Sequence, residues 1–330
     1  MIEKWDITIP ELTGDEVRSA YICLPEAYTH DINRRFPVLY MFDGHNLFFD
    51  SHATYGKSWG LKEYMEYTHT PLIIVGIECN HSPDHGRLQE YSPYDFTLPK
   101  EGKITGKGKI TMDWLTRTFK PYIDTHYRTL SDREHTFIAG SSMGGLMSIY
   151  ALLYYNQFFS RAAALSPSLW IAPNDSMQMI RRSRPLPGSI LYMDYGSREM
   201  KQHRKMDQAF AQAANLLLDK IIVFGSQGSN KIFNSNTRVG FPLTFQLFQL
   251  FVGGTDIESV ENSPVEVKAD INRLIVDSVM LCYFPGSTRL GLNIVEVSGI
   301  SGREVQCRQV SRISQRCVVF ADLLFVMDDT

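Results

Sequence analysis

The chain has 330 residues, of which 44% are hydrophobic and 12% aromatic, and its formal net charge is −3. This length can bury a sizeable core, either as one large domain or as a domain with an appendage. The nearly balanced charge gives no electrostatic reason to expect nucleic acid or an anionic membrane as a partner. The longest apolar runs, such as residues 72–77, are too short to span a bilayer.

The N-terminus and the cysteines bear on the cellular compartment. The opening residues, MIEKWDITIP, lack the apolar core of a signal peptide. The cysteines are widely scattered and form no CxxC pair, which argues against both a disulfide framework and a metal cluster. They are Cys23, Cys79, Cys282, Cys307 and Cys317. We therefore expect a cytoplasmic protein, and a homo-oligomer remains an option.

Short strands and longer helices alternate in the first two thirds of the chain. Residues 17–25 alternate apolar and polar side chains, as expected of a half-buried strand. Residues 37–44 and 71–78 are continuous apolar runs opened by proline, which is typical of strands buried on both faces of a parallel sheet. Helices are predicted over residues 58–68 and 112–127, and Pro121 should kink or restart the second.

The alternation continues beyond a polar stretch. Residues 80–111 are rich in Gly and Pro and predict a long loop that shapes the ligand site. A buried strand is predicted at 135–140 with a helix at 143–155, and a further strand at 188–196 with an amphipathic helix at 203–220. This order predicts an α/β fold with a doubly wound, mostly parallel sheet.

The composition changes near residue 220. Residues 221–330 contain no His, no Trp and one Tyr, and Arg outnumbers Lys there by seven to two. Alternating valine-rich pieces at 265–271 and 292–297 predict strands. We therefore divide the chain into a core, residues 1–220, and an atypical C-terminal segment with predicted strands, residues 221–330.

A serine stands at a sharp turn between a predicted strand and a predicted helix. Residues 140–144, GSSMG, fit the G-x-S-x-G pattern of a nucleophile elbow centred on Ser142. The small residues leave room for a strained serine backbone, and the Met143 backbone N–H would face an oxyanion. A tight glycine turn with an idle serine would have the same sequence, but the strand–turn–helix placement favours a nucleophile.

The second oxyanion donor is expected after an earlier strand. FDGHNLF, residues 42–48, follows the predicted strand at 38–41, and Gly44 would let the chain approach a substrate closely. The backbone N–H of His45 or Gly44 is the candidate donor. An Asx-type turn started by Asp43 is compatible with this role.

Seven segments together resemble the "putative esterase" family of α/β-hydrolases, which includes siderophore, feruloyl and acetyl esterases, esterase D-type thioesterases and mycolyltransferases. The resemblance covers about residues 5–220 and follows the family's order. The matching segments are FPVLYMFDGHNLF, YGKSWG, RLQEYSP, FKPYIDTHYRT, AGSSMGGLMSIYA, FSRAAALSPSLW and LYMDYGSRE.

This resemblance implies an α/β-hydrolase fold and a serine hydrolase acting on a small-molecule carboxylic ester, without cofactor or metal. It assigns the nucleophile to Ser142 and the oxyanion amides to His45 and Met143. The triad acid would be Glu199, with Asp194 as the alternative. Trp170 would line the substrate pocket, although a buried core aromatic is an equally simple interpretation.

The third member of the triad is missing where the family pattern expects it. A strand is predicted at 221–224, but the loop after it, GSQGSNKIFNSN, contains no His, and no His follows His203. Without such a base a serine hydroxyl is a poor nucleophile at neutral pH. His45, His85 and His203 are the substitutes that the sequence offers.

Three explanations compete for the altered C-terminal segment. They are a frameshift or fusion, an appended segment on a hydrolase that has lost catalysis, and an active enzyme with a relocated base. Two function classes stay open, an esterase and a non-catalytic protein that binds an ester or acyl ligand; within the enzyme class, acyl transfer to an alcohol other than water is a further option. A metal site at His81, Asp84 and His85 is disfavoured, because no helix sets its geometry.

Overall fold

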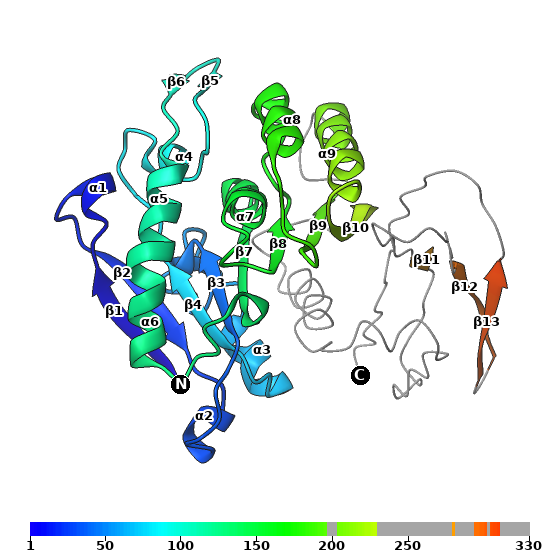
Figure 1. The fold of residues 1–330 in the computed structure, drawn as a ribbon, viewed down its shortest axis with the longest axis horizontal. Coiled ribbons are helices and arrows are strands. Elements are labelled where there is room, and N and C mark those ends of the chain that lie inside the picture. The colour runs from blue at the N-terminus through cyan, green and yellow to red at the C-terminus, as the bar shows by residue number, and fades with distance from the viewer. Residues whose placement is uncertain (197–202, 230–278, 281–293, 302–303, 311–330) are drawn as a thin grey trace.

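The chain forms an α/β fold around an eight-stranded sheet (Figure 1). The computed structural model describes residues 1–196, 203–229, 279–280, 294–301 and 304–310. The strand order is β1-β2-β4-β3-β7-β8-β9-β10; β1 and β2 run antiparallel to their neighbours, and all pairs from β4 to β10 are parallel. The strands are β1 (Ile2–Ile7), β2 (Arg18–Cys23), β3 (Val38–Phe42), β4 (Ile73–Ile77), β7 (Thr136–Ser141), β8 (Arg161–Leu165), β9 (Ile190–Gly196) and β10 (Ile222–Ser229). The mostly parallel sheet of the prediction is confirmed.

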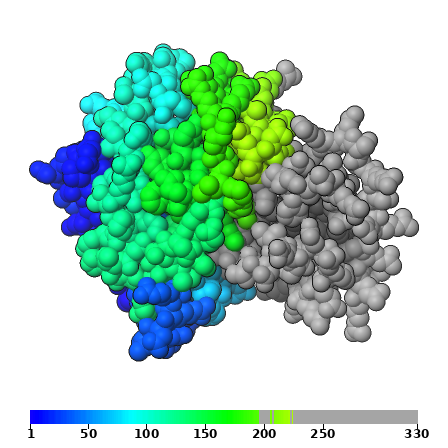
Figure 2. All heavy atoms as spheres, viewed as in Figure 1, coloured from blue at the N-terminus to red at the C-terminus, as the bar shows by residue number. Residues whose placement is uncertain are grey.

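Helices cover both faces of the sheet. The face seen in Figure 2 is covered by α5 to α9, and the opposite face is packed by α3. The longer helices are α3 (Leu61–Thr68), α5 (Gly108–Trp114), α6 (Lys120–His126), α7 (Met143–Tyr154), α8 (Pro173–Arg182) and α9 (His203–Leu218), with short helices α1 (Pro10–Thr13), α2 (Ala27–His30) and α4 (Gly86–Glu90). Neighbouring residues of β3 lie on opposite faces of the sheet. Tyr40 belongs to the core cluster that includes residues of α5 to α9, and Met41 belongs to the cluster that includes residues of α3. No helix within the described ranges is both long and apolar enough to cross a bilayer.

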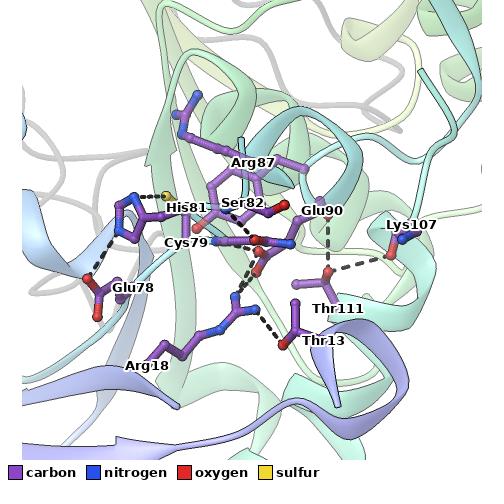
Figure 3. A network of polar contacts seen from close by, with 12 residues as sticks. Thr13, Arg18, Glu78, Cys79, His81, Ser82, Arg87, Glu90, Lys107 and Thr111 are labelled. Carbon is purple, nitrogen blue, oxygen red and sulfur yellow. Dashed lines mark hydrogen bonds and ion pairs between the residues drawn. The ribbon is translucent and has the colours of Figure 1, made fainter. Parts of the chain in front are cut away.

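The predicted half-buried strand at 17–25 is buried along its whole length. All six residues of β2 are buried, including Arg18 and Ser19. The Arg18 guanidinium binds both carboxylate oxygens of Glu90 at 3.0 and 2.8 Å (Figure 3). The Ser19 backbone N–H donates to Glu78 Oε2 at 2.7 Å. Arg18 and Ser19 can be buried because their polar groups have hydrogen-bond partners inside the protein. The alternation of apolar and polar residues in β2 therefore does not indicate which side chains are exposed.

The prediction of a long irregular loop at residues 80–111 is wrong. It contains α4, the hairpin of β5 (Phe96–Leu98) and β6 (Gly102–Ile104), and the start of α5. Glu90 at the end of α4 is fully buried and also accepts the Asn80 backbone N–H at 2.7 Å, while Asp95 accepts the Gly106 N–H at 3.0 Å. These contacts join residues ten and eleven positions apart, beyond the few neighbouring residues on which a prediction from local composition rests.

The helix predicted over 112–127 is interrupted before Pro121, as expected. Residues Leu115–Phe119 form the π-helical turn η2 between α5 and α6. Pro121 lies in the first turn of α6, where its missing N–H costs no hydrogen bond. The π-turn changes the spacing of the backbone hydrogen bonds just before Pro121, which has no N–H to continue the α-helical pattern.

Beyond residue 220, the first strand belongs to the main sheet. β10 begins at Ile222 and pairs in parallel with β9, so the core sheet extends past the predicted boundary. The strand predicted at 292–297 is found as β12 (Ile294–Ser301), which pairs with β11 (Val279–Met280) and β13 (Glu304–Val310). The strand predicted at 265–271 lies outside the described residues. The division into two segments stays a prediction.

Candidate active site

The residues singled out by the sequence follow neighbouring strands of the sheet. β3, β7, β8 and β9 are adjacent and parallel, so their carboxyl ends meet at one edge. Asp43 follows β3, Ser142 follows β7, and Asp194 lies near the end of β9. In α/β sheets this edge is where ligands bind.

Ser142 occupies a strained turn. It stands between β7 and α7 with φ 59° and ψ −117°, a left-handed φ that L-residues rarely adopt. Gly140 makes the turn feasible, because a Cβ there would lie 2.6 Å from the Gly144 carbonyl carbon. The Ser142 backbone N–H donates to Leu165 O of β8 at 2.9 Å, and its Oγ lies 3.1 Å from Ser168 Oγ. The predicted strand–turn–helix placement of Ser142 is therefore present.

The candidate oxyanion donors lie at two chain reversals. Met143 is the first residue of α7, where backbone N–H groups have no partner within the helix. His45 lies in the 3-10 turn η1 (Gly44–Asn46) directly after β3. A Cβ on Gly44 would lie 2.6 Å from the Ile77 backbone N of β4. The close approach that requires Gly44 is therefore to strand β4, and its role in a substrate pocket stays a prediction.

One arginine ties these two reversals together, and the sequence did not single it out. Arg87 of α4 donates from Nε and Nη2 to the two carboxylate oxygens of Asp43, both at 2.7 Å. Its Nη2 also lies 3.4 Å from the carbonyl oxygen of Ser141, the residue before Ser142. The Asx-type turn predicted at Asp43 is wrong, because the backbone carbonyl of Asp43, and not its carboxylate, accepts the Asn46 N–H at 2.9 Å. The carboxylate binds Arg87 instead, and this bidentate pair fixes η1 against the turn at Ser142.

Of the two candidate acids, one is described. Asp194 is 2% exposed, and its Oδ2 accepts the Tyr192 hydroxyl at 2.7 Å. Its carbonyl accepts the Ser166 N–H at 2.8 Å, which links β9 to the turn after β8. Glu199 lies outside the described residues. Trp170 follows the same turn and is half-buried against the core.

The candidate bases whose side chains the structure describes, His45 and His85, form no hydrogen bond with Ser142. Within the described ranges no histidine hydrogen-bonds to the Ser142 hydroxyl, whose partner is Ser168. His45 is buried and its Nε2 lies 3.0 Å from Thr54 Oγ1. His85 precedes α4 with φ 60°, and His203 begins α9 with a side chain outside the description. The structure therefore brings His45 to the site edge without pairing it with Ser142.

His45 instead meets a cysteine and a second histidine. One ligand atom each of His45, Cys79 and His81 lie within 4.8 Å of one another, and the Cys79 Sγ to His81 Nδ1 distance is 4.0 Å (Figure 3). Burial lowers the pKa of His45 and raises the pKa of the Cys79 thiol. A hydrogen bond to Glu78 Oε1, 3.1 Å away, raises the pKa of His81. Asp84 and His85, which the sequence placed with His81, are not part of this group.

Comparisons with known proteins agree with this geometry. The family model described as "Putative esterase" matches residues 13–245, more than two thirds of the chain. The match continues past residue 220, where the sequence resemblance was expected to end. A curated relative, the uncharacterized protein YbbA of Bacillus subtilis (strain 168), is 26% identical over 188 residues, which cover 56% of this chain and 70% of the relative.

Solved structures share the fold. An IroE-like serine hydrolase from Shewanella oneidensis has a TM-score of 0.58 at 20% identity, covering 76% of this chain and 80% of that one. The BES protein from Bacillus cereus has a TM-score of 0.56 at 16% identity, with coverage of 74% and 93%. The siderophore hydrolase EstA from Aspergillus nidulans has a TM-score of 0.55 at 18% identity, with coverage of 76% and 95%.

These structures resemble the chain in its overall fold. At such identities they establish the α/β-hydrolase fold, and the family model establishes the kinship. The chain belongs to the "putative esterase" family and so to the carboxylesterase-type hydrolases.

Proposed function

We propose that this protein cleaves a small-molecule carboxylic ester with Ser142 as nucleophile. The observation that carries the proposal is the left-handed Ser142 at the junction of β7 and α7, φ 59°. Such strain persists only where surrounding structure enforces it, and it is typical of functional positions. The family to which the chain belongs supports the same reaction class.

In this proposal the Ser142 Oγ attacks the acyl carbon and the alcohol leaves. The backbone N–H groups of Met143 and His45 stabilise the oxyanion, and water then releases the acid from the acyl-enzyme. The acid of the triad is Glu199, with Asp194 as the alternative. Trp170 and Gly44 are the proposed pocket residues, and a protein of this kind would work in the cytoplasm without a cofactor.

The proton acceptor limits the rate in this scheme. No histidine follows His203, so the position after β10 that the family pattern assigns to the base lacks one. An elbow and an oxyanion hole alone retain about 10³–10⁴-fold catalysis over water. We therefore expect slow but site-specific acylation.

The missing histidine supports a second candidate function. The same pocket would then bind an ester or acyl ligand without turning it over. Acyl transfer to an alcohol other than water is a variant of the first proposal, and it would use the same serine.

A fluorophosphonate separates these candidates, because it labels an activated serine whatever the natural substrate. The full-length protein is treated with the probe and its intact mass is followed, beside Ser142→Ala. Slow labelling to one adduct per chain that is absent from Ser142→Ala supports the esterase. A folded chain that takes up no probe supports the binding protein instead.

A further inference from the structure

The cluster next to the oxyanion loop has the composition of a metal site. His45 of η1 and Cys79 and His81, which follow β4, offer two imidazoles and one thiol. Thiolate and imidazole together select soft or borderline ions such as Zn²⁺ and Cu⁺. We propose that His45, Cys79 and His81 form a binding site for such an ion, with Zn²⁺ as its representative.

Both histidines are oriented as metal ligands usually are. The ring nitrogen Nε2 of His45 bonds to Thr54 Oγ1 at 3.0 Å, and Nε2 of His81 bonds to Glu78 Oε1 at 3.1 Å. Outer partners of this kind fix the ring and leave the other nitrogen for the ion. The remaining nitrogen is Nδ1 in each case, and in His81 it faces the Cys79 sulfur (Figure 3).

A buried polar atom supports the same arrangement. His45 Nδ1 is buried and has no hydrogen-bond partner among the described residues, although burying such an atom unpaired is costly. A metal ion bound to Nδ1 would remove that cost. The atom belongs to a side chain that is 5% exposed, so it is enclosed by the protein rather than by solvent.

The spacing needs only a small adjustment. Ligand atoms of a tetrahedral zinc site lie about 3.5 Å apart. Here the three ligand atoms lie within 4.8 Å of one another, so a contraction of roughly one ångström completes the set. His81 has a side chain that is 54% exposed, which allows the adjustment and gives the ion a route from solvent.

The charged residues around the three ligands favour binding of a cation. The three ligands also leave one coordination position of the ion open. The carboxylates of Asp43 and Glu78 both act on the two imidazoles, and Arg87 opposes them at His45. Binding would replace the thiol proton of Cys79, which is released to solvent. Three protein ligands leave a fourth position for water, as in zinc sites that exchange ligands.

Cobalt(II) reports this site directly, without any need for enzyme activity. Full-length protein is titrated with Co²⁺ under reducing conditions and its absorption is recorded. We expect one ion per chain, with the near-ultraviolet charge-transfer band of a cobalt–thiolate bond and the strong visible bands of a four-coordinate ion. Zn²⁺ should displace the cobalt and abolish both.

Variants assign the band to these residues. Cys79→Ser should lose the charge-transfer band, while Cys23→Ser, which alters the other buried cysteine among the described residues, should keep it. His81→Gln changes an exposed side chain with little risk to folding and should weaken binding by about tenfold or more. Absence of the band, or a band that survives in both Cys79→Ser and His81→Gln, would overturn the proposal.

Discussion

Arg87 is the residue on which the geometry of the site depends most directly. It is the bidentate partner of Asp43, whose side chain is 3% exposed, and it reaches Ser141 O. Removing one partner of a buried ion pair leaves an uncompensated charge. At the scale of single residues, η1 is therefore held by this ion pair in addition to the backbone hydrogen bond of its own turn.

Arg87→Met should destabilise the protein by about 3 kcal/mol, because Asp43 would remain buried without its cation. Arg87→Lys should recover part of this loss but not the two-point contact. Urea unfolding of both variants measures the effect. The matched control is Arg117→Met, whose side chain is 73% exposed and lies 3.9 Å from Asp113, and it should change stability by less than about 0.5 kcal/mol. Equal losses at the two arginines would contradict this account.

Asp50, which follows η1, should make the stability of the protein depend on pH. Hydrogen bonds from the Ser58 backbone N–H and from Lys57 lower the pKa of Asp50 below its ordinary value. An acid whose pKa is lowered by folding stabilises the native state above its unfolded pKa of about 3.9, and this contribution is lost as the pH falls through that value and below. Asp50→Asn should therefore lower the melting temperature most at neutral pH, with a difference that shrinks below about pH 4. A difference that stays constant on acidification would show that the charge of Asp50 is not involved.

At the scale of elements, η1 is wedged against β4. A Cβ on Gly44 would meet the backbone of Gly76 and Ile77, which cannot move without disturbing the sheet. Gly44→Ala should cost about 1–3 kcal/mol, and a shift of η1 by about an ångström should slow fluorophosphonate labelling by about 100-fold. Gly14→Ala is the control, since Gly14 has φ +59° but open space around it. Because its φ 59° and ψ −132° are strained for an L-residue, Gly14→Ala should also cost about 1–3 kcal/mol, but it should leave labelling unchanged.

The same element couples the proposed metal site to the reaction. An ion that draws His45 toward Cys79 would move the backbone of η1, and with it one oxyanion donor. Zinc should therefore slow Ser142 labelling by about tenfold or more, and EDTA should restore the rate. His81→Gln should make labelling insensitive to zinc at the same concentration. Cobalt binding without any change in labelling would refute the coupling while leaving the metal site intact.

The elements that the sequence predicted are those with local signals. The apolar runs of β3 and β4, the glycine-rich turn before α7 and the proline in the first turn of α6 were each readable in a window of a few residues. β8, a short strand of Arg and small residues, and the hairpin within 80–111 carry no such signal.

The residues of the site also divide into those with a local sequence signal and those without one. Ser142 was predicted because its motif is contiguous, and the structure bears out the turn. The Arg87–Asp43 pair and the meeting of His45 with Cys79 join segments far apart in the chain. Such pairs become neighbours only through the strand order β4-β3-β7, which no local pattern contains.

At the scale of the whole molecule, the histidines do not follow the strand after which the family pattern expects the catalytic base. The described sheet ends with β10, after which the family pattern expects the base, yet all nine histidines precede that strand. The elbow, the oxyanion loop and Asp194 gather at the same edge through β3, β7 and β9. Among the described residues the turn at Ser142 is therefore in place, while no histidine hydrogen-bonds to the Ser142 hydroxyl.

A small base added to the solution should take the place of the missing side chain. Imidazole should accelerate fluorophosphonate labelling of the full-length protein by about tenfold or more, part of the 10²–10⁴-fold that a positioned base supplies. Pyrazole, which has the same size but is a much weaker base, is the matched control and should have little effect. Ser142→Ala should stay unlabelled under both conditions. If labelling is already fast and imidazole adds nothing, the base lies within the chain, and Asn substitutions at His45, His85 and His203 will identify it, because only loss of the true base should create a response to imidazole.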